Sequence, residues 1–431
     1  MHRNSPGRWR RALLGLAGAA LMGCAPTVTP GDVGTGGGGT GGGGTGGGGG
    51  GGTGGGGSGG DVGGGTAVVW QQVAKLTAPD AAAQDAFGTT VAISDDTLIV
   101  GASNHNNRTG AAYVYTRAGT SWFLQSEVTA TDAVASSDFG IAVALSGDTA
   151  VVGASGVGST IPFLTQSGAA YVFERTGSQW SQQQRLALSD RQSFDYFGNA
   201  VAIDGDTALV GAFGRQASAG AAYAFMRTGS TWSQQAQLAE VDSGGTDWFG
   251  SAVALAGDTA VVGAHEQKSG TGAAYVFTRV GSAWSQQQKL LAPDAAPTDS
   301  FGQAVGLSGD TVVIGAPGTN DQSGQAHVFV RDGTIWTLQQ TLTADNGTFG
   351  REFGYAVGVD GDTLVVGTPK SSTVFVFTRN GTTWSRQQAL VPARGESYGI
   401  SAGISQNAIV GGANANGDQG LNSGAAYVFQ P

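Results

Sequence analysis

Four short segments, each with its own pattern of apolar and polar residues, recur along most of this chain. Three are nearly continuous apolar runs, such as residues 249–255, 260–264 and 273–277. Such runs are typical of strands that are covered on both faces. The fourth segment, for example residues 232–238, alternates and fits a strand with one face in water. Two-residue turns such as Asp204-Gly205 join the first two strands, so the pattern predicts four-stranded antiparallel sheets and no helix.

The four segments form a unit that is repeated seven times. A Phe-Gly pair marks six copies and a Tyr-Gly pair marks the seventh: Phe87-Gly88, Phe139-Gly140, Phe197-Gly198, Phe249-Gly250, Phe301-Gly302, Phe353-Gly354 and Tyr398-Gly399. Successive pairs are 52, 58, 52, 52, 52 and 45 residues apart. A period near fifty indicates a propeller or a solenoid, and four antiparallel strands in each unit favour the propeller. We therefore predict an all-β, seven-bladed β-propeller of four-stranded antiparallel blades over residues 66–431.

The two ends of the repeat region predict how the ring closes. The region begins with a strand around Trp70, at residues 70–76, ahead of the first Phe-Gly pair. It ends directly after the third strand of the last unit, at residues 427–429. The last blade therefore lacks a fourth strand, and the first segment has a strand to spare. We expect these two segments to pair, and we expect deletion of residues 70–76 to expose a strand edge and promote aggregation.

The repeated unit resembles the FG-GAP repeat, the blade of the integrin α-chain propeller, in a bacterial variant with a tryptophan and a run of glutamines. Unit five contains both halves of the motif, Phe301-Gly302 and Gly315-Ala316-Pro317. The resemblance covers residues 70–431 and implies the same propeller fold. Calcium-binding integrin blades carry an aspartate-rich loop between their first two strands, whereas this chain has tight turns such as Ser-Gly-Asp-Thr at that position. The resemblance therefore gives no support to an integrin-type calcium site.

The first 65 residues differ in composition from the repeats. Four arginines precede an apolar run at residues 12–22, which is too short to span a membrane and is typical of a signal peptide. The run ends in Leu21-Met22-Gly23-Cys24, which resembles a bacterial lipobox. We predict a signal peptide at residues 1–23 and lipidation of Cys24, with an incidental cysteine as the alternative. Residues 24–65 are expected to form a disordered tether, because glycine fills 26 of the 35 positions in residues 31–65.

Charge and the predicted anchor narrow the location and the partners. After removal of the signal peptide, 17 basic and 31 acidic residues remain, which gives a net charge of −14. An acidic surface disfavours nucleic acid and anionic lipid, so we expect membrane contact through the lipid anchor alone. Ala25 is not aspartate, the residue that typically retains lipoproteins at the inner membrane. We therefore expect the protein at the outer membrane or cell surface. We also expect it to be a monomer.

Pairs of aspartates precede several Phe-Gly pairs, on the side of the ring where the loops vary between blades. The pairs are Asp80 and Asp85, Asp190 and Asp195, Asp242 and Asp247, and Asp294 and Asp299. The favoured interpretation is structural, because aspartate side chains accept hydrogen bonds from turn backbone N–H groups. Binding of a divalent cation such as Ca²⁺ and acid–base catalysis are the alternatives. No other cofactor is expected.

The opposite side of the ring is predicted to be constant and structural. Units carry an aspartate in a Gly-Asp-Thr turn and an arginine after the third strand, for example Asp258 and Arg279. The strand order brings these two residues together, so we predict a structural ion pair in each of five blades. The tryptophan of each unit is interpreted as a packing residue. His327, which replaces the repeat tyrosine of a third strand, is expected to be packed as well.

Departures from the repeat on the variable side are the candidates for a binding site. Unit two is six residues longer than most, and one of its variable loops is apolar at residues 161–164. Units three and four add aromatic residues to neighbouring loops. If exposed, these side chains form a patch for a partner; alternatively, residues 161–164 fold back and plug the channel mouth. The tentative ligand-binding residues are Ile161, Phe163, Leu164, Tyr196, Phe213 and Trp248.

The sequence favours a binding protein over an enzyme. The mature chain contains three histidines, and it has no zinc-protease, serine-hydrolase or cysteine-based motif. We predict a lipid-anchored binding or adhesion module for a protein or glycan at the cell envelope. One alternative is a propeller enzyme that acts on envelope polysaccharide through two carboxylates. The other is a purely structural envelope protein.

Overall fold

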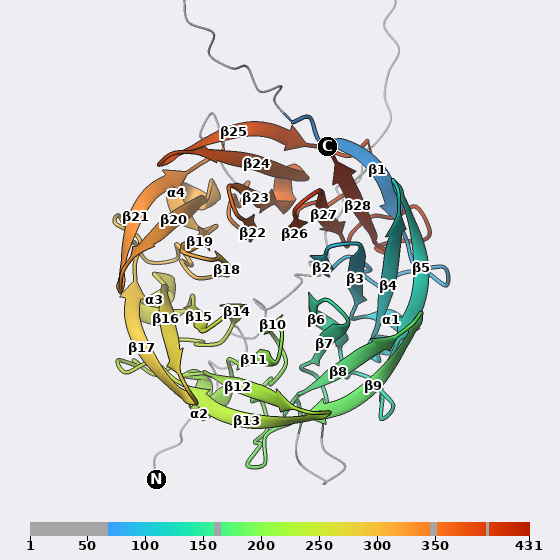
Figure 1. The fold of residues 1–431 in the computed structure, drawn as a ribbon, viewed down its shortest axis with the longest axis horizontal. Helices are drawn as coiled ribbons and strands as arrows, with labels where there is room; N and C mark the ends of the chain where they lie inside the picture. Colours follow the sequence, from blue (N-terminus) through green and yellow to red (C-terminus); the bar gives the residue numbers. More distant parts are fainter. Residues whose placement is uncertain (1–67, 159–164, 345–350, 394–395) are drawn as a thin grey trace, which may run out of the picture. The chain divides into compact units, whose positions relative to one another are not determined.

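Seven four-stranded sheets make up the part of the chain that the structure describes. The computed structural model describes residues 68–158, 165–344, 351–393 and 396–431, and all described strands lie in the compact unit Val68–Pro431. Each sheet is antiparallel, and the sheets follow one another like blades around an axis (Figure 1). The prediction of an all-β, seven-bladed propeller is confirmed. No helix in these four ranges is long and apolar enough to cross a membrane.

The strands of each blade follow one another outward from the axis (Figure 1). The first strands are β2 (Thr90–Ser94), β6 (Phe139–Ser146), β10 (Val201–Asp204), β14 (Ala252–Ala256), β18 (Ala304–Ser308), β22 (Ala356–Asp360) and β26 (Ser401–Ser405). The second strands are β3 (Thr97–Ala102), β7 (Thr149–Ala154), β11 (Thr207–Ala212), β15 (Thr259–Ala264), β19 (Thr311–Ala316), β23 (Thr363–Thr368) and β27 (Ala408–Ala413). The third strands are β4 (Ala111–Ala118), β8 (Ala169–Thr176), β12 (Ala221–Thr228), β16 (Ala273–Val280), β20 (Gln325–Asp332), β24 (Thr373–Asn380) and β28 (Ala425–Gln430). The outer strands are β5 (Ser121–Val128), β9 (Gln179–Leu186), β13 (Thr231–Leu238), β17 (Ala283–Leu290), β21 (Ile335–Leu342), β25 (Thr383–Leu390) and, in blade 7, β1 (Gln71–Leu76).

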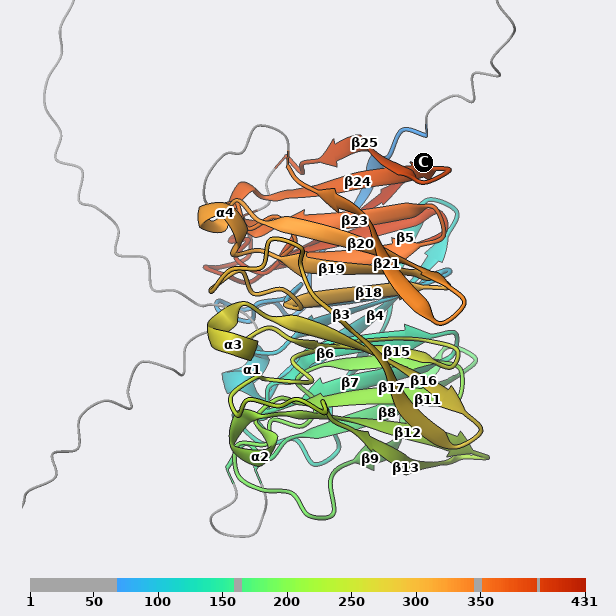
Figure 2. The ribbon, with the colours of Figure 1, turned by 90° about the vertical axis from the view of Figure 1, so that its left-hand side faces the viewer.

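Single helical turns lie in loops between the second and third strands, where no helix was expected. They are α1 (His105–Arg108), α2 (Arg215–Ser218), α3 (Gln267–Gly270), α4 (Thr319–Gln322) and the 3-10 turn η1 (Pro369–Ser371). In α1, Asn106 and Asn107 have φ angles of 48° and 57°, so left-handed residues build part of the turn. Four residues are too few to show a helical period in the sequence. Figure 2 shows α1, α2, α3 and α4 at one end of the strands, which we call the variable face.

The Phe-Gly pairs hold neighbouring blades together. In blade 4, Phe249 is fully buried, and its ring centroid lies 5.5 Å from that of Tyr275. Gly250 has a φ angle of 89°, and a Cβ atom there would lie 2.3 Å from the carbonyl oxygen of Ala221 in blade 3. Glycine alone accommodates both this backbone and this approach. A parallel bridge between Gly220 and Phe249 joins blades 3 and 4 at the same point.

Polar contacts at the opposite end of the strands also link neighbouring blades. Arg279 Nε donates to Asp258 Oδ1 at 2.7 Å, and the guanidinium lies 5.2 Å from the ring centre of Trp284. Arg279 Nη1 donates to Thr207 Oγ1 of blade 3 at 2.8 Å, and Trp284 Nε1 donates to Gln235 Oε1 at 2.8 Å. The predicted ion pairs are confirmed: Asp148–Arg175, Asp206–Arg227, Asp258–Arg279, Asp310–Arg331 and Asp362–Arg379. Such exposed pairs contribute at most about 1 kcal/mol each.

The first and last strands of the unit share one sheet. β1 runs antiparallel to β28, with Gln71 opposite Gln430, and the strand order of this sheet is β1-β28-β27-β26. A parallel bridge between Phe87 and Gly424 adds a second contact between blades 1 and 7. How strongly the stability of the ring depends on β1 stays a prediction.

Candidate functional site

On the variable face, one position has the same backbone conformation in every blade, but its side chain differs between blades. The residue before each Phe-Gly or Tyr-Gly pair has a left-handed backbone, with φ angles between 52° and 58°. In blades 1 to 6 its N–H donates to a loop carbonyl of the preceding blade, as Trp248 does to Ser218 at 3.0 Å. The seven residues are Ala86, Asp138, Tyr196, Trp248, Ser300, Glu352 and Ser397. Variable side chains on a rigid scaffold are typical of a binding face.

Blades 3 and 4 place four aromatic side chains in one row on the variable face. We call Phe194, Tyr196, Phe213 and Trp248 the aromatic surface. The Tyr196 ring stacks on that of Phe213, with centroids 4.7 Å and planes 10° apart. Phe194 lies 6.2 Å from Tyr196, and Trp248 lies 5.6 Å from Phe213, measured between ring centroids. Tyr196, Phe213 and Trp248 are among the ligand-binding residues predicted from the sequence, and the structure brings them together.

Exposure separates the aromatic surface into an outer and an inner part. Phe194 is 51% exposed, and Tyr196 and Trp248 are partly buried. The expectation that Phe213 is exposed is wrong, because its side chain is only 5% exposed and packs between Tyr196 and Trp248. Phe213 therefore supports the neighbouring rings, and the other three rings are the ones that a partner can reach.

Several predicted site residues lie outside the described residues. They are Cys24, Ile161, Phe163 and Leu164. Whether residues 161–164 extend the aromatic surface or plug the channel stays a prediction. The same holds for the signal peptide and the tether.

The second aspartate of each pair stabilises a turn. Asp85, Asp195, Asp247 and Asp299 are between 1% and 5% exposed. The Oδ2 atom of each accepts a hydrogen bond from the backbone N–H three residues earlier, at 2.8 Å for Asp85, 2.6 Å for Asp195 and 2.7 Å for Asp299. Burial raises the pKa of Asp195 and of Asp299 above its ordinary value. These contacts support the structural interpretation of the aspartate pairs.

The first aspartate of each pair has different neighbours in different blades. Asp190 pairs with Arg215 of α2, and Asp242 pairs with Lys289 of β17. A carboxylate that an internal cation already neutralises is a poor candidate for a bound metal ion. Asp294 lies in blade 5, where none of the described ion pairs includes it. Asp80, in blade 1, forms a group with His105 and Glu127. Among the described residues, this is the one group of three histidine, cysteine, aspartate or glutamate side chains whose potential metal-ligand atoms lie within 4.8 Å of one another.

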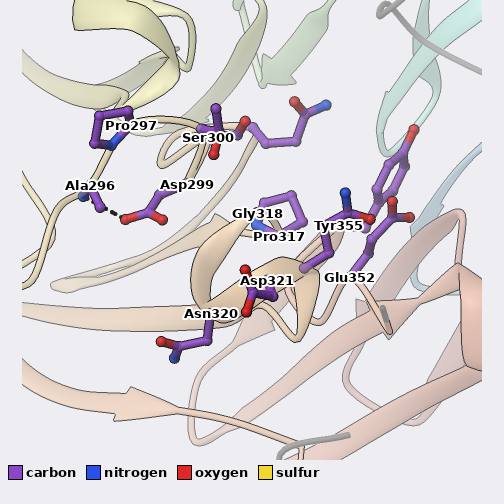
Figure 3. Close-up of a pocket in the computed structure, with 13 residues that line it drawn as sticks. Ala296, Pro297, Asp299, Ser300, Pro317, Gly318, Asn320, Asp321, Glu352 and Tyr355 are labelled. Carbon is purple, nitrogen blue, oxygen red and sulfur yellow. Dashed lines mark hydrogen bonds between the residues drawn. The ribbon is translucent and has the colours of Figure 1, made fainter. Parts of the chain in front are cut away.

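A polar cavity of about 740 Å³ lies between blades 5 and 6 (Figure 3). Its lining comes from residues 296–300, from α4 and from the start of blade 6, and it includes the carboxylates of Asp299, Asp321 and Glu352. Asp299 accepts a backbone hydrogen bond, and Glu352 pairs with Lys370 at 2.7 Å. The cavity therefore offers hydroxyl, amide and carboxylate groups, of which two carboxylates already have protein partners.

Glu240 is a buried acid that was not among the residues predicted from the sequence. It is 9% exposed, and its Oε2 accepts a hydrogen bond from Gln267 Nε2 at 2.9 Å. Burial raises the pKa of Glu240 to about 7, although its hydrogen bond with Tyr275 lowers it. Other units carry an apolar residue at this position: Ala78, Ala130, Leu188 and Ala292. A glutamate at a repeat position where other units have alanine or leucine is the sequence feature that could have identified this residue.

Comparison with known proteins identifies the family. The model of the FG-GAP repeat matches residues 70–115, 122–173, 180–225, 232–277, 284–329, 336–381 and 384–429, so the chain belongs to the FG-GAP repeat family. No curated protein matches it. The resemblance inferred from the Phe-Gly units is confirmed.

Two solved structures show the same fold at low sequence identity. A candidate 6-phosphogluconolactonase from Bacteroides uniformis is similar with a TM-score of 0.52 and 13% identity, over 70% of this chain and 85% of its own. The structure of U3-55K is similar with a TM-score of 0.53 and 11% identity, over 81% of this chain and 97% of its own. At such identities the likeness concerns the fold alone. The fold is compatible with a binding module.

Proposed function

We propose that this chain is a lipid-anchored binding module of the cell envelope that takes a glycan on the aromatic surface. The observation that carries the proposal is the row formed by Phe194, Tyr196 and Trp248, whose rings are reachable and whose backbone belongs to a rigid ring of blades. Aromatic side chains contribute large contact areas at binding sites. The polar cavity between blades 5 and 6 is a separate feature of the molecule, and its hydroxyl, amide and carboxylate groups also suit a hydroxyl-rich ligand. A protein partner is the second outcome of the test below.

Trp248→Ala and Tyr196→Ala are expected to weaken glycan binding by about tenfold or more, because each removes a large contact area. A protein that consists of residues 68–431, which contain every described strand, is screened on a glycan array. The affinity for each glycan that binds is then measured for the unmodified protein and for both variants. Phe123→Ala is the matched control, since Phe123 is 57% exposed but lies on outer strand β5. The melting temperature should fall by at most a few degrees.

The outcome can also contradict the proposed surface. Full affinity in both variants would exclude the aromatic surface as the binding site. If no glycan binds and a purified envelope protein binds in a Trp248-dependent way, the partner is a protein. Mass analysis of the incubated glycans tests the polysaccharide-cleaving alternative, for which the acid-lined cavity is the supporting observation.

Cys24→Ser is expected to abolish lipidation and to move the full-length protein from the membrane fraction to the soluble fraction. The reason is that a thioether-linked lipid needs the cysteine thiol, and Cys24 is the one cysteine of the chain. Immunoblots of fractionated cells measure the change. Ala25→Asp is the companion variant, which should keep the lipid but retain the protein at the inner membrane. Membrane-bound Cys24→Ser protein with an uncleaved signal would contradict the proposal.

A further inference from the structure

A basic side chain pairs with an acidic loop residue on the variable face in four of the seven blades. The acidic residue lies seven positions before the Phe-Gly pair in blades 2, 3 and 4, and in the loop between β27 and β28 in blade 7. In three of them the cation comes from the outer strand, from the residue opposite the third-strand tyrosine: Arg185 opposite Tyr171, Lys289 opposite Tyr275 and Lys75 opposite Tyr427. The ion pairs are Arg185–Asp132, Lys289–Asp242 and Lys75–Asp418. In blade 3 the cation is Arg215, the first residue of α2, which binds Asp190 and Asp195. In each of these four blades the acidic loop residue therefore has a basic partner.

Blade 1 has a different residue at each of the two positions that carry the lysine or arginine in these other blades. Glu127 lies opposite Tyr113, so a carboxylate stands where three other blades have lysine or arginine. The first residue of α1 is His105, at the position of Arg215 in α2. None of the ion pairs among the described residues joins Asp80 or Glu127 to a lysine or arginine. Asp80 and Glu127 thus both lie beside the imidazole of His105.

The imidazole of His105 is oriented by a buried carboxylate. Its Nδ1 lies 3.0 Å from Oδ2 of Asp85, which is 3% exposed and is itself fixed by the N–H of Ala82. When Nδ1 donates its proton to that oxygen, the Nε2 lone pair is free to bind a metal ion. Nε2 lies 3.5 Å from Oδ2 of Asp80, and the other carboxylate oxygen, Oδ1, accepts a hydrogen bond from Tyr113 Oη at 2.8 Å. A buried carboxylate behind a histidine is a recurrent arrangement around protein metal ions.

We propose that Asp80, His105 and Glu127 form a binding site for a divalent first-row transition-metal ion of the Zn²⁺ type. One atom from each residue lies within 4.8 Å of the other two. Two ligands that each lie about 2.0 Å from a tetrahedral ion are about 3.3 Å apart, close to the 3.5 Å between His105 Nε2 and Asp80 Oδ2. The same separation is longer than an ordinary N–H···O hydrogen bond of about 2.9 Å. An imidazole nitrogen favours Zn²⁺ and its neighbours over Ca²⁺, which takes oxygen ligands.

The proposed ion connects three segments and keeps one coordination position open. Asp80 lies between β1 and blade 1, His105 in α1 and Glu127 in β5, so bound metal should raise the melting temperature. Asp80 and Glu127 are exposed, so a fourth ligand can approach from solvent. The site lies apart from the aromatic surface of blades 3 and 4 and does not depend on the function proposed for that surface.

Calorimetric titration of residues 68–431 with ZnCl₂, without a histidine tag, tests the site. This segment contains no cysteine, and its other histidines, His265 and His327, are 3% and 0% exposed. We expect one Zn²⁺ per chain and an increase in melting temperature. His105→Arg copies blade 3, and Glu127→Lys copies blade 4; each should weaken Zn²⁺ binding by about tenfold or more while the chain stays folded.

Asp294→Asn is the matched control, because Asp294 is the corresponding first aspartate of blade 5, where Thr319 replaces His105. This variant should bind Zn²⁺ as the unmodified segment does. Failure of the unmodified segment to bind Zn²⁺ would overturn the proposal. The proposal would also be overturned if His105→Arg and Glu127→Lys bound Zn²⁺ as tightly as the unmodified segment does. CaCl₂ is titrated in parallel, and tighter binding of Ca²⁺ than of Zn²⁺ would overturn the assigned class of ion.

Discussion

Gly250→Ala is expected to lower the free energy of unfolding by about 3 kcal/mol or more, or to prevent folding. Gly250 has a φ angle of 89°, which costs an alanine about 1 kcal/mol or more. In addition, the new Cβ would lie 2.3 Å from the carbonyl oxygen and 3.0 Å from the carbonyl carbon of Ala221. These backbone atoms belong to blade 3, so relief of the clash requires blades 3 and 4 to separate where Phe249 is buried.

Gly229→Ala separates the cost of this close approach from the cost of the backbone angle. Gly229 has a φ angle of 63°, and nothing lies within 4 Å of a Cβ placed there. We expect this variant to lose only about 1 kcal/mol. Urea unfolding of both variants, followed by tryptophan fluorescence, measures the difference. Equal losses would show that the contact between blades at the Phe-Gly pair does not stabilise the ring.

The fold could be predicted from the sequence because its signals are local and are repeated. Continuous apolar runs, two-residue turns and a period near fifty residues depend only on neighbours along the chain. The Asp–Arg pairs could also be predicted, because the strand order of one blade brings a turn and a strand end together, as at Asp258 and Arg279. The Phe-Gly pairs marked the units, but their role between blades appears only in the structure, where Gly250 meets Ala221.

The site was harder to predict, because its contacts join different blades and loops. Phe213 and Trp248 were correctly grouped, but the burial of Phe213 follows from the stacking of Tyr196, whose loop enters from a separate segment. The left-handed position before each Phe-Gly pair gives no periodic signal, since its side chain varies from alanine to tryptophan. His105 could not be singled out from the sequence, because its distances to Asp80 and Asp85 depend on how the loop that carries it folds.

His327→Phe is expected to make the propeller more resistant to mild acid. His327 is fully buried in β20, its Nδ1 contacts Thr341 Oγ1 at 3.1 Å, and its Nε2 has no hydrogen-bond partner. Burial lowers the pKa of His327 from 6.5 to about 4, against an opposing effect of Asp294. The unfolded chain therefore takes up a proton as the pH falls through 6.5, whereas the folded chain does so only near 4. The contribution of neutral His327 to the free energy of unfolding is therefore complete above pH 6.5. It falls by about 3 kcal/mol in total as the pH decreases from 6.5 to about 4.

Phenylalanine is the appropriate replacement, because blade 6 carries Phe375 at the same position, with ring centroids of Phe353 and Phe375 5.6 Å apart. Urea unfolding at about pH 7.5 and about pH 5 should show a loss of stability that is smaller by about 2 kcal/mol in His327→Phe than in the unmodified chain. Glu240, whose raised pKa acts in the opposite direction, is present in both proteins and cancels in the comparison. The reciprocal variant Phe375→His should steepen the acid loss. If both variants lose as much stability as the unmodified chain, a buried neutral histidine does not set the acid sensitivity of the ring.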